Sequence, residues 1–172
     1  MALIAMAGLP GVGKSTIARG LAERFPGVLI NVDDVASALV RAEFERSFAT
    51  GLAGYLVAEQ VARVNLALGS HVIVDGANSA GYARNIWTAL AREFGTELLF
   101  VEVVCTDLAA HAARLATRRL PAGQPRISFD DVVVAYAEAE SWAAEPRWLV
   151  NTTEDVDHDQ VFADVQAALR GY

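Results

Sequence analysis

The residues with the clearest chemical meaning surround the only lysine of the chain, Lys14. It belongs to the run Gly8-Leu-Pro-Gly-Val-Gly-Lys14-Ser15, a full match to the pattern G-x-x-x-x-G-K-[ST], whereas the other thirteen of the fourteen basic residues are arginine. A compact ammonium group fits between two phosphate groups, and a broad guanidinium group does not. The sequence therefore keeps a lysine at the position where binding of adjacent phosphates requires one.

The segments on either side of this motif have the patterns of a strand and a helix. Residues 2–7 form an unbroken apolar run, and Ile17, Leu21 and Phe25 recur on one helical face. Glycines let backbone N–H groups close around phosphate oxygens, and a helix N-terminus adds partial positive charge. This context predicts a nucleoside triphosphate site with Mg²⁺, in which the Ser15 hydroxyl is a metal ligand. The expected contacts come from Gly8, Leu9, Pro10, Gly11, Val12, Gly13, Lys14, Ser15 and Thr16.

Two adjacent acids, Asp33 and Asp34, follow an apolar run at about 28–32. If that run is a strand of a parallel sheet, the acids lie at its carboxyl edge, where such sheets bind ligands. A carboxylate there can accept the proton of an attacking hydroxyl group. We expect Asp33 to be this general base, and Asp34 to assist at the substrate or to cap the helix that begins near residue 34. The alternative is that the pair serves only as a helix cap.

A third acid, Asp75, ends the apolar run 71–75 and takes the place of a Walker B acid, which holds Mg²⁺ directly or through water. Hydrolytic ATPases commonly use a following glutamate to activate water, and here glycine follows instead. This favours transfer to a hydroxyl group over hydrolysis. Asn78, Tyr82 and Arg84 come soon afterwards and are candidate contacts for the acceptor, with a surface or capping role as the alternative for each.

Two arginines, Arg114 and Arg118, stand four residues apart on a predicted helix over about 107–119, which places them on one face. They precede a Pro/Gly loop at 121–125, so we interpret residues 114–127 as a lid. Closing on the nucleotide, such arginines would bind its phosphates and stabilise the charge that spreads during transfer. The alternative is that they only balance the helix dipole.

Other polar and aromatic residues are weaker candidates. Some follow the last predicted strand, in a turn expected beside the phosphate loop, and others lie in the loop of the lid or after the paired acids. These candidates are Asn151 and Thr152 for the nucleotide base, Arg126 for phosphate, and Arg41, Phe44, Phe48 and Tyr55 for the acceptor.

Apolar runs rich in β-branched residues alternate with longer helical patterns along the whole chain. This alternation predicts an α/β fold with three layers, in which helices cover both faces of a five-stranded parallel sheet. The expected strands lie at about 2–7, 28–32, 71–75, 97–104 and 147–151. The expected helices lie at about 14–25, 34–48, 51–68, 80–94, 107–119, 128–143 and 157–170.

Length and composition limit the remaining possibilities. The 172 residues suffice for a substantial core, and we expect a single domain over 1–172. Although 53% of the residues are apolar, no run approaches the roughly 18 apolar residues of a membrane span. The single cysteine, Cys105, fits a reducing cytoplasm and is expected to be a small buried residue. A net charge of −7 disfavours nucleic acid, so we expect a small-molecule partner, no membrane contact, and a monomer or homodimer.

In their order along the chain, these motifs resemble small P-loop kinases of the AAA_33 type, which include the 5′-hydroxyl kinase domain of phage polynucleotide kinase, chloramphenicol phosphotransferase and zeta toxin. The polynucleotide kinase domain has the most similar pattern, with Asn31-Val-Asp33-Asp34 after the second strand and Arg-x₃-Arg in a lid helix. The resemblance extends over nearly the whole chain. It implies a P-loop NTPase fold with sheet order 2-3-1-4-5 and a helical lid. It also implies Asp33 as general base, Lys14 and Ser15 as triphosphate and Mg²⁺ contacts, and Arg114 and Arg118 as lid arginines.

One departure from the polynucleotide kinase pattern concerns the acceptor. That pattern has an arginine shortly after the paired acids, which helps to hold a 3′-phosphate, and here Val35, Ala36 and Ser37 follow. We therefore expect transfer of the γ-phosphoryl group of ATP to a hydroxyl of a small molecule, such as a metabolite, nucleoside or antibiotic. A 5′-hydroxyl kinase of oligonucleotides is the first alternative. A nucleotide-dependent switch or hydrolysing regulator is the second, although the guanine motif Asn-Lys-x-Asp cannot exist when Lys14 is the only lysine.

Overall fold

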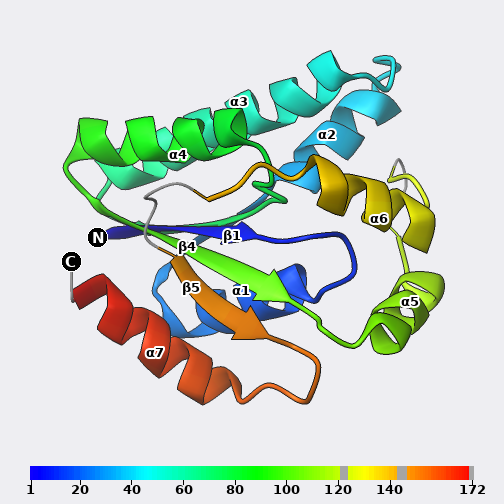
Figure 1. The fold of residues 1–172 in the computed structure, drawn as a ribbon. Coiled ribbons are helices and arrows are strands. Elements are labelled where there is room, and N and C mark those ends of the chain that lie inside the picture. Colours follow the sequence, from blue (N-terminus) through cyan, green and yellow to red (C-terminus); the bar gives the residue numbers. More distant parts are fainter. Residues whose placement is uncertain (121–123, 143–146, 171–172) are drawn as a thin grey trace.

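Five parallel strands form the central layer of the computed structural model, which describes residues 1–120, 124–142 and 147–170 (Figure 1). The strands are β1 (Ala2–Ala7), β2 (Gly27–Asn31), β3 (His71–Asp75), β4 (Glu97–Val104) and β5 (Arg147–Asn151). Their order across the sheet is β2-β3-β1-β4-β5, and every pair is parallel. The predicted sheet order and strands are thus confirmed, with the second strand shifted by one residue.

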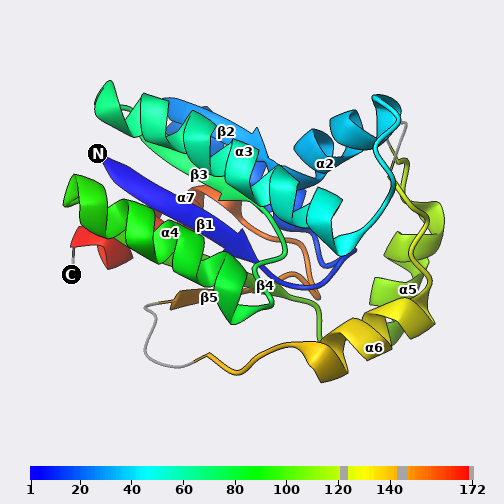
Figure 2. The ribbon, with the colours of Figure 1, turned by 90° about the horizontal axis from the view of Figure 1, so that it is seen from above.

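Helices cover both faces of the sheet because β1 is apolar at every position and buries alternate side chains on opposite sides. Ile4 and Met6 pack against α1 (Lys14–Arg24) and α7 (His158–Arg170). Leu3 and Ala5 pack on the other side, under α3 (Phe48–Ala67) and α4 (Gly81–Phe94), which run side by side in Figure 2. This arrangement leaves the carboxyl ends of the strands as the uncovered edge of the sheet.

Three shorter helices lie beyond that edge. They are α2 (Val32–Arg41), α5 (Leu108–Thr117) and α6 (Phe129–Glu138), which Figures 1 and 2 both show on the side toward which the strands point. The segment between α5 and α6 includes most of the lid expected at 114–127, of which residues 121–123 lie outside the described residues. The phosphate loop, the paired acids and the lid are therefore gathered at one edge.

Two predicted helices were too long. The helix expected at 34–48 ends at Arg41, because Glu43 adopts a left-handed backbone with φ 68° and Ser47 begins α3 by accepting a hydrogen bond from the Thr50 N–H at 3.2 Å. The helix expected at 128–143 ends at Glu138. Within the described part of the chain, no helix is long and apolar enough to cross a membrane.

Candidate active site

The phosphate loop connects β1 to α1 through a backbone that requires glycine. Gly8 has φ 128°, and a Cβ atom there would lie 2.2 Å from the Val103 carbonyl oxygen. Gly13 has φ 102° and stands at the N-cap of α1, which brings the N-terminus of that helix to the end of the loop. Any side chain at Gly8 would force the loop away from β4. The sequence therefore builds a glycine-rich turn that leads into a helix N-terminus, the arrangement that binds anions.

Three different segments hold the loop in place. The Gly8 N–H donates to the Ala77 carbonyl at 3.0 Å, and the Thr152 hydroxyl donates to the Val12 carbonyl at 2.6 Å. His111 of α5 is buried, and its Nε2 lies 2.7 Å from the Pro10 carbonyl oxygen. Because a carbonyl only accepts, this histidine carries its proton on Nε2. The loop is thus fixed before any ligand binds.

Sequence reasoning gave His111 no role, although the structure makes it a support of the phosphate loop. Its helical neighbour Leu115 lies against the same loop, since a Cβ atom on Gly11 would come within 2.7 Å of the Leu115 side chain. The four-residue spacing of His111 and Leu115 was the available sign that both face one partner. That spacing is too common to identify the partner from the sequence.

Lys14 folds back over the loop, where its Nζ donates to the Leu9 carbonyl at 2.8 Å. Burial lowers the pKa of this ammonium, and the carboxylates of Asp75 and Asp33 oppose the shift. The guanidinium of Arg118 also lowers it, with the smallest effect. The lysine charge is therefore desolvated at the loop and stabilised by two acids, and an anionic ligand would offset its loss of hydration.

Asp75 is only 4% exposed at the end of β3. Its carboxylate accepts a hydrogen bond from the Asn31 amide at 2.8 Å, and the Ser15 hydroxyl is close enough to lower its pKa. Burial raises the pKa of Asp75, while the bond from Ser15 and the charge of Lys14 act in the opposite direction. The structure thus brings together Ser15 and Asp75, the two residues predicted to serve Mg²⁺.

Asp33 and Asp34 lie in the first turn of α2, and both are exposed. The predicted cap at Asp34 is wrong: Asn31 is the N-cap, and its Oδ1 accepts the Asp34 N–H at 3.0 Å. The negative charge of Asp33 raises the pKa values of Lys14, Asp75 and Tyr55. Asp33 is thus exposed and electrostatically coupled to the phosphate-loop lysine, and its role as general base stays a prediction.

The two predicted lid arginines do not share a helical face, because α5 ends at Thr117 and Arg118 has an extended backbone. Arg114 binds Thr152, donating to its hydroxyl at 3.0 Å and to its carbonyl at 2.6 Å. Thr152 itself holds the Val12 carbonyl, so Arg114 is joined to the phosphate loop through one residue. Asn151, by contrast, is exposed and its side chain accepts from the N–H and hydroxyl of Thr153.

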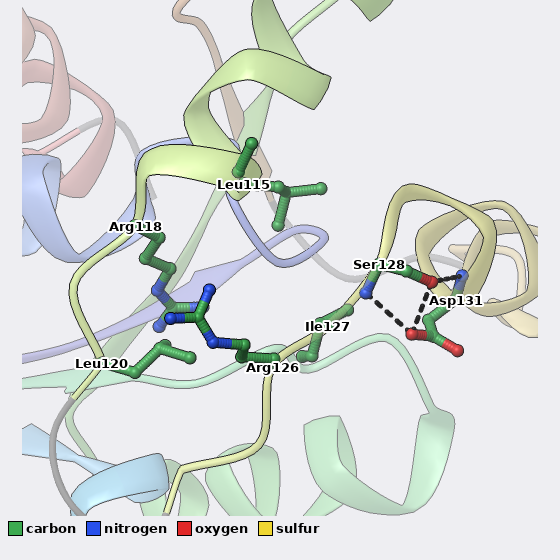
Figure 3. Close-up of a pocket in the computed structure, with 8 residues that line it drawn as sticks. Leu115, Arg118, Leu120, Arg126, Ile127, Ser128 and Asp131 are labelled. Atoms are coloured by element: carbon green, nitrogen blue, oxygen red, sulfur yellow. Dashed lines mark hydrogen bonds between the residues drawn. The ribbon is translucent and has the colours of Figure 1, made fainter.

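Arg118 connects the lid to α2. It donates to the Gln124 side chain at 3.4 Å, and the Gln124 amide donates in turn to Asp34 at 3.3 Å. The same arginine lines a pocket of about 290 Å³ beside the phosphate loop, where its guanidinium and that of Arg126 extend toward one another (Figure 3). The carboxylate in this pocket, Asp131, accepts from the N–H and hydroxyl of Ser128. Two guanidinium groups therefore make the pocket electropositive.

Two residues expected to contact the acceptor are parts of the interior instead. Asn78 is fully buried, where its amide donates to the Met6 carbonyl at 2.6 Å and its oxygen accepts from Trp87 at 2.9 Å. Arg84 is 2% exposed, donates to the Ser141 carbonyl at 3.0 Å and stacks over Trp142 at 4.6 Å. The prediction that these side chains face the acceptor is wrong, since both are engaged inside the protein.

Three aromatic side chains pack together, and one of them, Tyr55, feels the charge of Asp33. Tyr55 accepts the Asn78 N–H at 3.2 Å, and burial raises its pKa to about 12, so it stays neutral. Its ring centre lies 6.5 Å from that of Tyr82, which in turn lies 5.6 Å from that of Phe48. Tyr82 and Phe48 are exposed. The other candidates on this side, Arg41 and Phe44, are exposed at and after the end of α2.

The chain was compared with protein families and solved structures. Residues 3–137 match the model of the AAA_33 family, described as an AAA domain. The chain belongs to this family. A comparison with curated proteins found no match.

Solved structures share this fold over nearly the whole chain. A protein of Chloroflexus aurantiacus with a provisional kinase assignment is 19% identical, with TM-score 0.78 and 98% of each chain covered. A gluconokinase from Sinorhizobium meliloti is 15% identical, with TM-score 0.69 and coverage of 98% of this chain and 91% of that one. An APS kinase from Mycobacterium tuberculosis, solved with AMPPNP and APS, is 16% identical, with TM-score 0.67 and coverage of 98% and 97%. This AAA_33 domain thus has the fold of P-loop kinases.

Proposed function

We propose that the protein is an ATP-dependent phosphotransferase that moves the γ-phosphoryl group of ATP to a hydroxyl group of a small molecule. The observation that carries the proposal is Lys14, which folds over the phosphate loop and whose charge is stabilised by two acids, Asp75 and Asp33. One acid is buried against the Ser15 hydroxyl and the other is exposed. This division suits one acid for metal and the other for the acceptor.

The residues present fit a triphosphate with Mg²⁺. The loop has the left-handed glycines and the helix N-terminus that surround phosphate oxygens, and it is already held by Thr152 and His111. Ser15 and Asp75 would hold Mg²⁺, with Asp75 acting through water. The metal would neutralise charge on the transferring phosphoryl group. Arg118 and Arg126, which face one another in the lid pocket, would bind the phosphates from the other side.

The proposed transfer is a single displacement. Asp33 accepts the proton of the acceptor hydroxyl group while the oxygen of that hydroxyl forms a bond to the γ-phosphorus. The bond between the γ-phosphorus and the β–γ bridging oxygen breaks at the same time. ADP leaves with the electron pair of the broken bond. Lys14, Arg118 and Arg126 stabilise the negative charge on the transferred group throughout this step.

Three features support a small acceptor of low charge. Arg84, the first arginine after β3, binds carbonyl groups inside the protein instead of extending to the cleft. Phe48 and Tyr82 present exposed rings that pack against one another, which suits a molecule with an apolar face. The related folds include a gluconokinase and an APS kinase, whose names refer to small-molecule substrates.

The experiment that tests this function offers the protein, with ATP and Mg²⁺, a panel of hydroxylated metabolites, nucleosides and antibiotics together with a 5′-hydroxyl oligonucleotide at about 150 mM salt, where polyanion binding is weak. Mass spectrometry should detect ATP-dependent gain of one phosphoryl group on a small compound. The Lys14→Met variant is the control and should give no product. Efficient labelling of the oligonucleotide, with a micromolar or lower KM, would replace the small-molecule proposal with the 5′-hydroxyl kinase alternative.

A further inference from the structure

The outward side of α3 carries a contiguous group of exposed apolar side chains. We call it the α3 face, and it comprises Leu56, Val57, Gln60, Val61, Val64 and Leu68. The exposed fractions of its apolar members are 48% for Leu56, 44% for Val57, 40% for Val61, 58% for Val64 and 76% for Leu68. Most of these residues, together with Asn65, line a shallow groove of about 530 Å³. In Figure 1 the helix lies in the outer layer, away from α5 and α6.

The apolar residues of the α3 face are not the ones that α3 contributes to the core. The opposite side of the same helix is already buried, at Ala58, Ala62 and Leu66. Val57, Val61, Val64 and Leu68 are therefore a second apolar stripe, separated by four, three and four residues. That alternation is the spacing of the a and d positions of a coiled-coil seam, which packs against another helix.

The charged residues of α3 are turned away from this stripe. Its only two, Glu59 and Arg63, face α4, where Arg63 forms ion pairs with Glu59 and with Glu93. The α3 face, all of whose residues are described, contains no charged side chain. Because each chain carries a net charge of −7, two copies repel one another over most of their surface. An uncharged apolar face is where that repulsion is smallest and the gain from burial is largest.

We propose that the α3 face is the interface of a homodimer in which the α3 helices of two copies pack against one another about a two-fold axis. Such an axis brings one patch against its own copy, which a regular seam of valine and leucine satisfies. Residues 56–68 span about 20 Å of helix. A contact of this length is short for a specific interface, so the dimer should dissociate on dilution. The proposal is independent of the chemistry at the phosphate loop.

Analytical ultracentrifugation over a range of protein concentrations tests the proposal. The wild-type mass should rise with concentration from 18.4 kDa toward twice that value. Val64→Glu should weaken association at least ~10-fold, because a charge buried at the seam loses its hydration without a partner. The matched control is Val133→Glu on α6, where the native valine is 55% exposed against 58% for Val64. Both positions are exposed, so thermal melts should show that both variants remain folded.

A disulfide experiment supplies a second readout. The one native cysteine, Cys105, is 8% exposed and should not form a disulfide between copies. Any covalent dimer therefore forms through the cysteine introduced at the surface. Under mild oxidation, Val64→Cys should form a covalent dimer much faster than Val133→Cys. A wild-type protein that stays monomeric at all concentrations would overturn the proposal. A dimer that survives Val64→Glu, or that Val133→Glu disrupts equally, would overturn it as well.

Discussion

The side chain of Asn31 joins Asp75 to the helix that carries Asp33. Its amide nitrogen donates to the Asp75 carboxylate at 2.8 Å, while its oxygen accepts the Asp34 N–H at 3.0 Å and so caps α2. One residue therefore fixes the buried acid at the end of β3 relative to the exposed acid in the first turn of α2. A change at Asn31 should disturb both parts of the site.

Two substitutions separate the roles of Asn31. Asn31→Ser keeps a capping oxygen but is too short to reach Asp75, whereas Asn31→Ala removes both interactions. We expect both variants to lose roughly ten-fold in kcat, since misplaced catalytic groups slow transfer. Only Asn31→Ala should also lose about 1 kcal/mol of stability, measured by urea unfolding, through loss of the cap. Full activity in Asn31→Ser would show that the contact with Asp75 does not matter.

Lys14 should be indispensable for transfer and dispensable for folding. Lys14→Met removes the charge that would bridge two phosphates, and the loss of kcat/KM should be on the order of 10²-fold or more. Lys14→Arg should fail similarly, because the guanidinium fork does not fit the loop. Steady-state kinetics with a circular dichroism melt of each variant provides the measurement. Near-normal turnover by Lys14→Arg would contradict the assigned role.

Asp33 and Asp34 should differ in their effects on transfer. If Asp33 is the base, Asp33→Asn should lower kcat by roughly 10²–10⁴-fold with a modest change in the KM for ATP. Asp34→Asn serves as the matched control, since its carboxylate contacts Gln124 of the lid and it should cost far less activity. A larger loss of kcat at Asp34 would reverse the two roles. Equal, small effects would remove both acids from the chemistry.

The burial of Asp75 should make the thermal stability of the protein depend on pH. Burial raises its pKa above the usual 3.8, so folding favours the neutral acid. The stability that comes from this preference for the neutral acid is fully present below the pKa of Asp75 in the unfolded chain. It is lost as the pH rises through the higher pKa of Asp75 in the folded protein. Asp75→Asn stays neutral and should therefore melt at a higher temperature than the wild type at pH 7, by about 2–4 °C for each kcal/mol gained. The two melting curves should converge toward pH 3.

Melting temperatures measured from pH 3 to pH 8 check this prediction, and Asp75→Asn should meanwhile lose Mg²⁺-dependent activity. A wild-type protein that is the more stable of the two at pH 7 would contradict it. In that case the bonds from Ser15 and Asn31 would outweigh the cost of burying the charge.

Much of the fold could be predicted because its determinants are local. The strands are short apolar runs, and the order 2-3-1-4-5 followed from the resemblance to P-loop kinases. The end of α2 could not be predicted, since it depends on a left-handed residue, Glu43, in a sequence that also suits a longer helix. Side-chain direction was also beyond the sequence. Arg84 is drawn inward by Trp142 and by the Ser141 carbonyl, which lie more than fifty residues away along the chain.

The residues of the candidate site also divide into those that local sequence predicts and those that depend on distant contacts. The phosphate loop, the acids and the pair Arg114 and Arg118 were predicted from residue types and spacing, because each occurs in a recognisable motif. Their roles in binding and transfer stay predictions. The supports of the loop were not recognised as such, since Thr152 was expected only to contact the nucleotide base and His111 had no predicted role. His111 and the hydroxyl of Thr152 hold single carbonyl groups through contacts more than a hundred residues apart in sequence, and neither belongs to a motif.

The most direct test of the central claim is phosphorus NMR of ATP and Mg²⁺ mixed with the protein and an acceptor identified from the panel. If Asp33 directs the γ-phosphoryl group to a hydroxyl, ADP and a phosphomonoester of the acceptor should form in equal amounts, with little inorganic phosphate. The reaction should stop in Lys14→Met. Release of inorganic phosphate at a rate that the acceptor does not change would instead identify a hydrolysing regulator and contradict the proposed transfer.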